Sequence, residues 1–341
     1  MIRHLLKICG IKGKVLVCLA LLSFLGGLAA APALAQAPAG PQVSPETPAA
    51  GAPPEEKKET APSTAGPIIC DTTIPIDTGH VSLSVLSALS FYPGFFNSNW
   101  RTVNIGGNFY TYYMPVKVTY GPTKNMEVYL IAPFINYWAN NVDAGIAGPN
   151  GQRSASYAGI GDLTLMGKYN LLPEGDVMPA VSAVAGFASI PTGHASHLNP
   201  NLLGVDAIGT GALTFTTGVN LFKWVKPFLL YSNIWINSPV NIYQNNSENV
   251  VSREYITFNL AAEYPLSSKF VALLEFYSNW TWSNIYTPQG YQTPETYLGI
   301  LPGLEFLATE KLSFEAGASL DLAGKNGVKK YTPMLMASYA F

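Results

Sequence analysis

The side chains that could perform covalent chemistry are gathered in one short stretch, His194-Ala-Ser196-His197. Residues two apart on a strand share a face, so His194 could be the base that activates a Ser196 nucleophile. Such a pair would suit hydrolysis of a lipid ester. The stretch follows Pro191-Thr-Gly193, however, which favours a loop, and two histidines without a nearby carboxylate or cysteine make a poor zinc site. We therefore predict no enzyme, no metal site and no cofactor, and keep a lipid hydrolase as an alternative.

Charged side chains form a second candidate set, because they alternate with apolar residues along segments of extended pattern. Charge inside a barrel suits a water-filled or partly filled path, whereas charge is costly on a lipid-facing surface. They are expected either to line a path for solutes or to form an inter-strand network that plugs the lumen, and the sequence leaves both open. His80 is also expected to face the lumen. The candidates for lining the lumen are Lys117, Glu127, Asp162, Lys168, Arg253, Glu263, Glu275, Glu305, Glu315 and Asp321.

The elements that must position these charges are segments with the period-two alternation of strands. In segment 312–322, for example, Phe314 and Ala316 oppose Ser313 and Glu315. Short connections alternate with long ones, as the turns and loops of an up-and-down barrel require. We therefore predict an all-β fold, a transmembrane up-and-down antiparallel β-barrel of about 12 strands. The expected strands are 78–91, 109–120, 126–138, 159–172, 180–193, 209–222, 226–238, 253–265, 269–282, 295–308, 312–322 and 330–341.

The C-terminal segment alternates apolar or aromatic residues with smaller ones and ends on Phe341. An edge strand of this kind is a liability in a soluble domain. In a barrel it closes against the first strand, so that no backbone group is left unpaired in lipid. We therefore expect 330–341 to pair antiparallel with 78–91. Aromatic residues such as Tyr264 and Trp280 fall near strand ends, where two girdles would meet the two water interfaces.

The front of the chain indicates export. Basic residues, an apolar stretch and the small-x-small site Ala33-Leu-Ala35 predict that residues 1–35 are a secretory signal peptide. Segment 36–67 is rich in Ala and Pro, so we expect a disordered periplasmic leader before the barrel domain 68–341. Cys70 would be the only cysteine left, which rules out an internal disulfide. Charged residues are 12% of the chain and its net charge is −2, with no basic cluster for nucleic acid.

Two short motifs carry a family resemblance. A strand beginning Gly159-Ile-Gly-Asp162, followed by a strand that ends in Pro191-Thr-Gly193, resembles the meta-pathway phenol-degradation (MetA-pathway) family of outer-membrane proteins. The resemblance would cover residues 78–341 and leave out the leader. It implies a transporter-like β-barrel, similar to porins or to transporters of hydrophobic solutes. It does not imply a phenol-degrading enzyme, and no catalytic residues carry over.

These expectations place the chain in the outer membrane of a Gram-negative bacterium. The predicted partners are outer-membrane lipids, a small hydrophobic solute and the barrel assembly machinery, since the aromatic Phe341 resembles the signal which that machinery reads. Inward positions such as Met166, Leu273 and Met334 are apolar. The predicted function is therefore a channel for passive uptake of small hydrophobic or aromatic molecules. The alternatives are a barrel lipid hydrolase using His194 and Ser196, and a plugged barrel with a structural or adhesive role.

Overall fold

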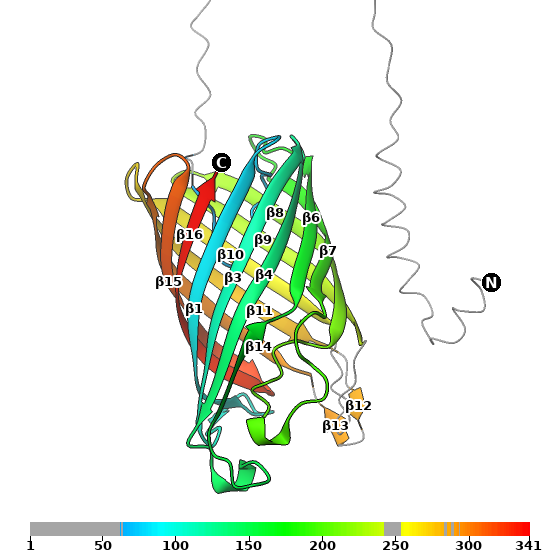
Figure 1. The fold of residues 1–341 in the computed structure, drawn as a ribbon. Coiled ribbons are helices and arrows are strands. Elements are labelled where there is room, and N and C mark those ends of the chain that lie inside the picture. Colours follow the sequence, from blue (N-terminus) through cyan, green and yellow to red (C-terminus); the bar gives the residue numbers. More distant parts are fainter. Residues whose placement is uncertain (1–61, 63, 242–253, 283–284, 288–289, 293) are drawn as a thin grey trace, which may run out of the picture. The chain divides into compact units, whose positions relative to one another are not determined.

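The chain folds as a closed antiparallel β-barrel of twelve long strands, as predicted (Figure 1). The structure is a computed structural model, and it describes residues 62, 64–241, 254–282, 285–287, 290–292 and 294–341. Among the described residues, no helix has the length and apolar character needed to cross a membrane. The barrel strands are β1 (Val81–Phe96), β3 (Asn108–Thr123), β4 (Met126–Asn140), β6 (Leu163–Leu172), β7 (Ala180–Ile190), β8 (Ala212–Val225), β9 (Phe228–Asn241), β10 (Tyr255–Pro265), β11 (Phe270–Thr281), β14 (Thr296–Leu307), β15 (Leu312–Lys325) and β16 (Gly327–Ala340).

Several short elements accompany the twelve barrel strands. The strands β2 (Thr102–Val103) and β5 (Ala155–Ile160) extend the main sheet, and β12 (Ile285–Thr287) pairs with β13 (Gly290–Gln292) in a separate hairpin. Two 3-10 helices, η1 (Ala144–Ile146) and η2 (Pro200–Leu202), lie in the connections after β4 and β7. Short turns gather at one rim of the barrel, here called the turn end. The longer connections gather at the opposite rim, the loop end, which also carries the tight β15–β16 turn at Asn326.

The last strand closes the barrel against the first. Leu83 of β1 lies opposite Tyr339 of β16, and Val85 lies opposite Ala337. The Phe341 N–H then donates to the Val81 carbonyl at 2.9 Å. This is the antiparallel closure expected from the alternating C-terminal sequence, and it leaves neither of these strands as a free edge.

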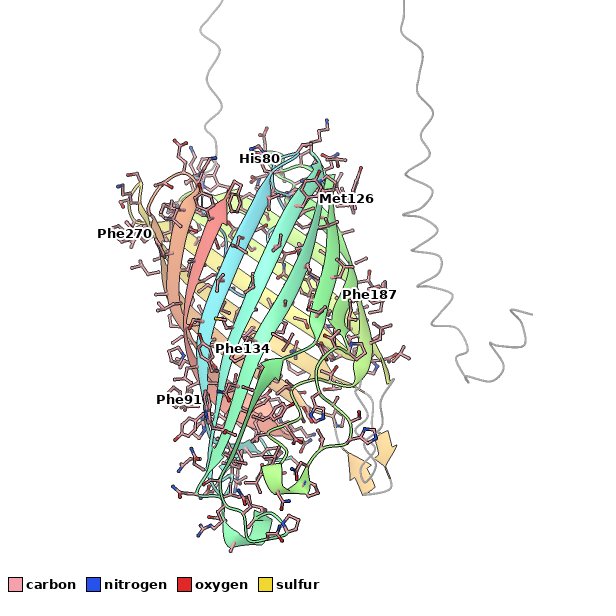
Figure 2. All side chains as sticks on the ribbon, in the orientation of Figure 1. His80, Phe91, Met126, Phe134, Phe187 and Phe270 are labelled. Carbon is pink, nitrogen blue, oxygen red and sulfur yellow. The ribbon has the colours of Figure 1, made fainter. Side chains whose placement is uncertain are left out.

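The strands alternate between an apolar outer face and a mixed inner face. On β15 and β16, Phe314 and Leu335 are 45% and 63% exposed, whereas Glu315 is only 2% exposed. In a one-layer wall the buried set points into the lumen, and lipid would cover the exposed apolar set. Figure 2 shows Phe187 and Phe270 at the outer surface of two other strands.

Exposed aromatic residues gather towards both rims, as two girdles require. Tyr120, Tyr264 and Tyr339 are exposed near the turn end of their strands. Trp280 and Trp282 are exposed at the loop end of β11. Rings at both rims mark out the height of the band that a bilayer would contact.

One turn lies later in the chain than the sequence pattern predicted. We expected the turn after β8 at 223–225, but Lys223 still pairs with Leu230 and the strand runs to Val225. The reversal is made by Lys226 and Pro227. The physical reason is that Pro227 has no backbone N–H, so it is the residue that cannot continue the ladder.

The predicted strand 159–172 is in fact two strands. β5 pairs only with β4, whereas β6 pairs with both β4 and β7, and the two are separated at Gly161 and Asp162. A Cβ on Gly161 would lie 2.6 Å from the Ile135 Cδ1 atom and 3.1 Å from the Ile208 carbonyl oxygen, so a larger residue would require its neighbours to shift. The break leaves the wall between β5 and β7 unpaired towards the loop end, where the connection 191–211 covers it.

Candidate functional site

The loop half of the lumen holds a cavity of about 370 Å³ beside this break in the wall. Six of its lining residues matter for the argument: the rings of Tyr113, Tyr137 and Tyr255, the aliphatic side chains of Ile135 and Ile208, and the carboxylate of Asp162. They come from β3, β4, β10 and the segments around the break. The cavity thus combines tyrosine rings and aliphatic side chains with polar groups, which also include Thr164, Ser189 and Thr210.

Asp162 is the centre of a hydrogen-bond network that fixes one wall of the cavity. Its Oδ1 accepts from the Gly193 N–H at 2.9 Å. Its Oδ2 accepts from the Thr210 N–H at 2.8 Å, from the Thr210 hydroxyl at 2.7 Å and from the Ser189 hydroxyl at 2.8 Å. The carboxylate therefore ties both ends of the connection 191–211 to the strand break, and its hydrogen-bonding capacity is already used within the protein.

We expect the Asp162→Ala variant to lose about 2–4 kcal/mol of stability, because several donors lose a charged acceptor. The connection 191–211 should then become cleavable by protease in the folded barrel. Limited proteolysis and thermal unfolding measure both effects. The matched control is Asp143→Ala, since Asp143 is exposed in another loop and makes no side-chain cap to η1. Equal protease resistance in the two variants would contradict the role given to Asp162.

The three tyrosines of the cavity carry free polar groups. Within the described residues, the hydroxyls of Tyr113, Tyr137 and Tyr255 have no hydrogen-bond partner, while their rings form part of the wall. A phenol hydroxyl both donates and accepts. The cavity can therefore offer hydrogen bonds to a bound molecule without an unpaired charge.

The turn half of the lumen is filled by the chain itself. Residues 64–77, here called the lumen segment, precede β1 and lie against the inner wall. Glu275 of β11 accepts N–H groups from three consecutive residues of this segment: Ile68 at 2.8 Å and Ile69 at 3.1 Å on Oε1, and Ile69 at 3.0 Å and Cys70 at 2.7 Å on Oε2. A run of backbone N–H groups around one carboxylate is a strong anion-binding arrangement.

A buried ion-pair network holds the middle of the lumen segment. Lys168 of β6 lies 3.2 Å from Glu127 Oε1 and 3.4 Å from Asp71 Oδ1, and all three side chains are nearly inaccessible. Lys168 also donates to the Thr72 carbonyl at 2.9 Å. Asn233 of β9 donates to the Asp71 carbonyl at 2.9 Å and accepts its N–H at 2.8 Å. The wall thus binds the segment through main-chain groups as well as through Asp71.

Four glutamates of the inner wall, Glu263, Glu275, Glu305 and Glu315, lie close to one another, with no ion pair to a cation among the described residues. Glu305 accepts from the Ala65 N–H at 2.7 Å, and Glu263 accepts from the Tyr231 hydroxyl at 3.0 Å. Glu315 is directly opposite Glu305 across the β14–β15 pair, and neither of its oxygens has a partner in the described part of the chain. Like charges in directly opposed positions repel. The donors to this cluster among the described contacts are N–H groups of the lumen segment and the Tyr231 hydroxyl.

The remaining predicted lumen residues have separate positions. The Lys117 ammonium lies 4.2 Å from the centre of the Tyr129 ring. Asp321 is buried and accepts from the Tyr277 hydroxyl at 2.8 Å. Arg253 lies outside the described residues. The structure thus gathers several acids around the lumen segment and leaves Lys117 and Asp321 apart from them, and a role of these residues in a solute path stays a prediction.

His80 does not face the lumen, contrary to our expectation. β1 begins only at Val81. His80 belongs to the exposed turn before this strand (Figure 2), and the His80 N–H donates to the Asp77 carbonyl at 3.0 Å. The alternating pattern that placed His80 inside was extended beyond the true start of β1. A strand pattern says which residues share a face but not where pairing starts.

The histidine and serine of the possible hydrolase site are not brought together. His194 Nδ1 lies 3.0 Å from the Asp206 carbonyl, and its ring packs on Tyr157. The Ser196 hydroxyl instead lies 3.3 Å from Nδ1 of His197, which has a left-handed backbone (φ 57°). Within the described residues, no three histidine, cysteine or acidic side chains are arranged to hold a metal ion. These are the hydrogen bonds of a loop that packs against its neighbours, and they do not join His194 to Ser196.

No pattern in the sequence indicated the contacts of the lumen segment. A carboxylate that binds backbone N–H groups selects no residue type in its partner, because every residue except proline has the same donor. The polar wall residues Asn220 and Asn233 were missed for a related reason. Asparagine on an inner barrel face has no charge to mark it, although Asn220 donates to Asp71 Oδ2 at 2.9 Å. Only the alternation that turns these residues inward could have identified them.

Comparison with known proteins supports the fold. The crystal structure of the COG4313 outer membrane channel from Pseudomonas putida F1 is similar, with a TM-score of 0.62 at 14% identity over 79% of this chain and 98% of the channel. The Ralstonia pickettii toluene transporter TbuX matches with a TM-score of 0.40 at 9% identity, over 78% of this chain and 90% of that protein. No curated protein matches the chain. At these identities the likeness shows a β-barrel that resembles bacterial outer-membrane channels.

The sequence itself matches a family model. The match runs over residues 101–335, from the loop before β3 into β16, and so takes in nearly the whole barrel. It includes the strand break at Gly161 and Asp162 and the Pro191-Thr-Gly193 stretch, the two motifs that carry the family resemblance. The chain belongs to the family described as "Putative MetA-pathway of phenol degradation".

Proposed function

We propose that the barrel lets small hydrophobic or aromatic molecules cross the outer membrane by passive diffusion. The observation that carries this proposal is the cavity of about 370 Å³ lined by tyrosine and isoleucine side chains. An apolar cavity of about 150 Å³ is large enough to hold benzene. There is therefore room for one substituted aromatic ring, whose faces would meet the tyrosine rings and isoleucine side chains of a wall that also carries polar groups.

The polar groups of the cavity favour a ring that carries a hydroxyl. Tyr113, Tyr137 and Tyr255 offer hydroxyls that have no hydrogen-bond partner among the described residues, each able to donate or accept. Asp162 takes little part in this, since its oxygens are already bound. Membership of a family described by phenol degradation supports the same class of solute.

This function implies a setting for the rest of the barrel. Outer-membrane lipids would surround the exposed apolar face, and Phe341 would be the signal for the barrel assembly machinery. The charged residues of the turn half, such as Lys168 and Glu275, would form the polar wall through which the solute passes to the periplasm. In the proposed function the aromatic solute is taken up unchanged, so no enzymatic step is involved.

Liposome swelling tests the proposal directly. Reconstituted barrel should speed the entry of phenol-like solutes well above that of sugars of similar size and of charged solutes. The Ile208→Trp variant should bring phenol entry down towards the rate of protein-free liposomes, because Ile208 is buried in the cavity wall and the larger ring fills the space. Ile146→Trp is the matched control, as Ile146 is exposed on η1. Equal entry of sugars and phenols would count against an aromatic path.

A further inference from the structure

The inner wall at the turn end recognises a peptide backbone. Glu305, Glu275 and Glu127 each accept N–H groups from the lumen segment, and Glu127 Oε2 takes the N–H of Ile76 at 3.0 Å. These acceptors come from β14, β11 and β4, so the contacts cross the lumen from one side to the other. The segment therefore occupies a built binding site that spans the barrel.

Apolar contacts support the same placement. Ile68 and Ile69 pack on a buried cluster that includes Leu273, Leu301 and Met334. Cys70 is 3% exposed and belongs to a second cluster, which contains Ala180, Phe222, Leu229, Tyr231 and Ala261. The segment is thus held by packing on two sides of the lumen, in addition to its hydrogen bonds.

Without the lumen segment, the wall behind it would present carboxylates that lack partners. Glu315 and Glu305 face each other, and Glu315 has no partner for either oxygen in the described part of the chain. When the segment is absent, these carboxylates need water or cations around them, because burying unpaired charge is costly. An acidic, hydrated passage would then replace a filled one.

We propose that residues 64–77 are a removable plug with Glu275 as its main anchor, and that solute leaves the cavity for the periplasm only while the plug is unseated. The second half of this inference rests on the proposed function, whereas the seat and the anchor do not. The plug is part of the chain, so its local concentration at the seat is always high. It therefore reseats after each opening.

Cys70 reports whether the plug is seated. Burial, and then the nearby Glu275 carboxylate, raises the pKa of the Cys70 thiol, so a thiol reagent reacts slowly with the seated form. In the full-length barrel, Glu275→Gln should speed labelling by a maleimide reagent by about tenfold or more, since charge-assisted bonds are lost. Glu315→Gln is the matched control. Glu315 belongs to the same acidic cluster, yet neither of its oxygens has a hydrogen-bond partner in the described part of the chain. Fast labelling of the unmodified barrel, or equal rates in the two variants, would overturn the seat and anchor.

A disulfide tests whether the plug must move. Ala180 and Ala261 belong to the same buried cluster as Cys70, so Ala180→Cys or Ala261→Cys should form an internal disulfide with it on oxidation. Peptide mapping identifies the bond, and failure of both variants to form it would overturn the seat. In liposomes, oxidation should stop phenol entry and reduction should restore it, with no such effect when Cys70→Ser is added. Unchanged entry in the locked barrel would overturn the gating role. Absence of entry in every form would instead overturn the proposed function and the gating role together, and the labelling result would still decide the seat.

Discussion

Replacing Lys168 by methionine should destabilise the barrel by about 3–5 kcal/mol, the range found when one partner of a buried ion pair is removed. Lys168 is the cation between Glu127 and Asp71, at 3.2 and 3.4 Å, and its side chain has no exposed surface. Methionine preserves the length of the side chain and leaves two acids buried without a counter-charge. Urea unfolding of the refolded protein in lipid vesicles, followed by tryptophan fluorescence, measures the loss.

The same chain offers a matched surface pair. Lys223 lies 3.2 Å from Glu174, but the two side chains are 23% and 26% exposed. Lys223→Met should therefore cost only about 0–1 kcal/mol. Adding Glu127→Gln to Lys168→Met should recover part of the stability, since one unpaired charge is removed. Equal losses in Lys168→Met and Lys223→Met would show that the buried network does not hold the segment.

Placing a charge on the outer face should have a comparably large effect that depends on depth. Leu335 lies in the middle of β16 and is 63% exposed, so an arginine there would face the centre of the bilayer. Leu335→Arg should cost about 2–4 kcal/mol, the range for arginine at the midplane of a membrane barrel. The measurement is again urea unfolding in vesicles.

The control for depth lies on the same strand. Val328 is near the loop end of β16 and is 44% exposed, so Val328→Arg should cost only about 0–1 kcal/mol in the interface. Leu335→Ala separates the loss of apolar contact from the cost of the charge. A cost for Leu335→Arg no greater than that for Val328→Arg would mean that β16 does not present Leu335 to the bilayer core.

The wall of the barrel could be predicted from sequence because its signal is local. On β15, the alternation of Phe314 with Glu315 already states which side chain meets lipid and which meets the lumen, and the structure places them so. The pairing of β16 with β1 followed from the same alternation together with the need to leave no open edge in lipid. Both inferences use only the period of two and the cost of an unpaired backbone.

The features that failed to show in the sequence are those in which a tertiary contact overrides the local pattern. Residues 159–172 alternate well enough for one strand, yet Asp162 is drawn away to Gly193 and Thr210, and the strand divides there. The lumen segment is a more extreme case, since its seat recognises main-chain atoms common to all residues. Charged positions such as Glu275 could be named as inward-facing, but their partner could not.

The route of the lumen segment also bears on how the barrel is assembled. Ala65 is exposed beside Glu305, close to the end of β14, and Asp77 is exposed beside the turn between β3 and β4, where Gly79 donates to Gly121 at 2.7 Å. Both ends of the segment therefore lie at the same rim, and residues 64–77 enter the barrel without passing through it. The segment is therefore not threaded through the barrel. The strands can pair and close the barrel first, and the segment can then bind inside it. The segment can also leave as a loop while every hydrogen bond between the wall strands stays intact.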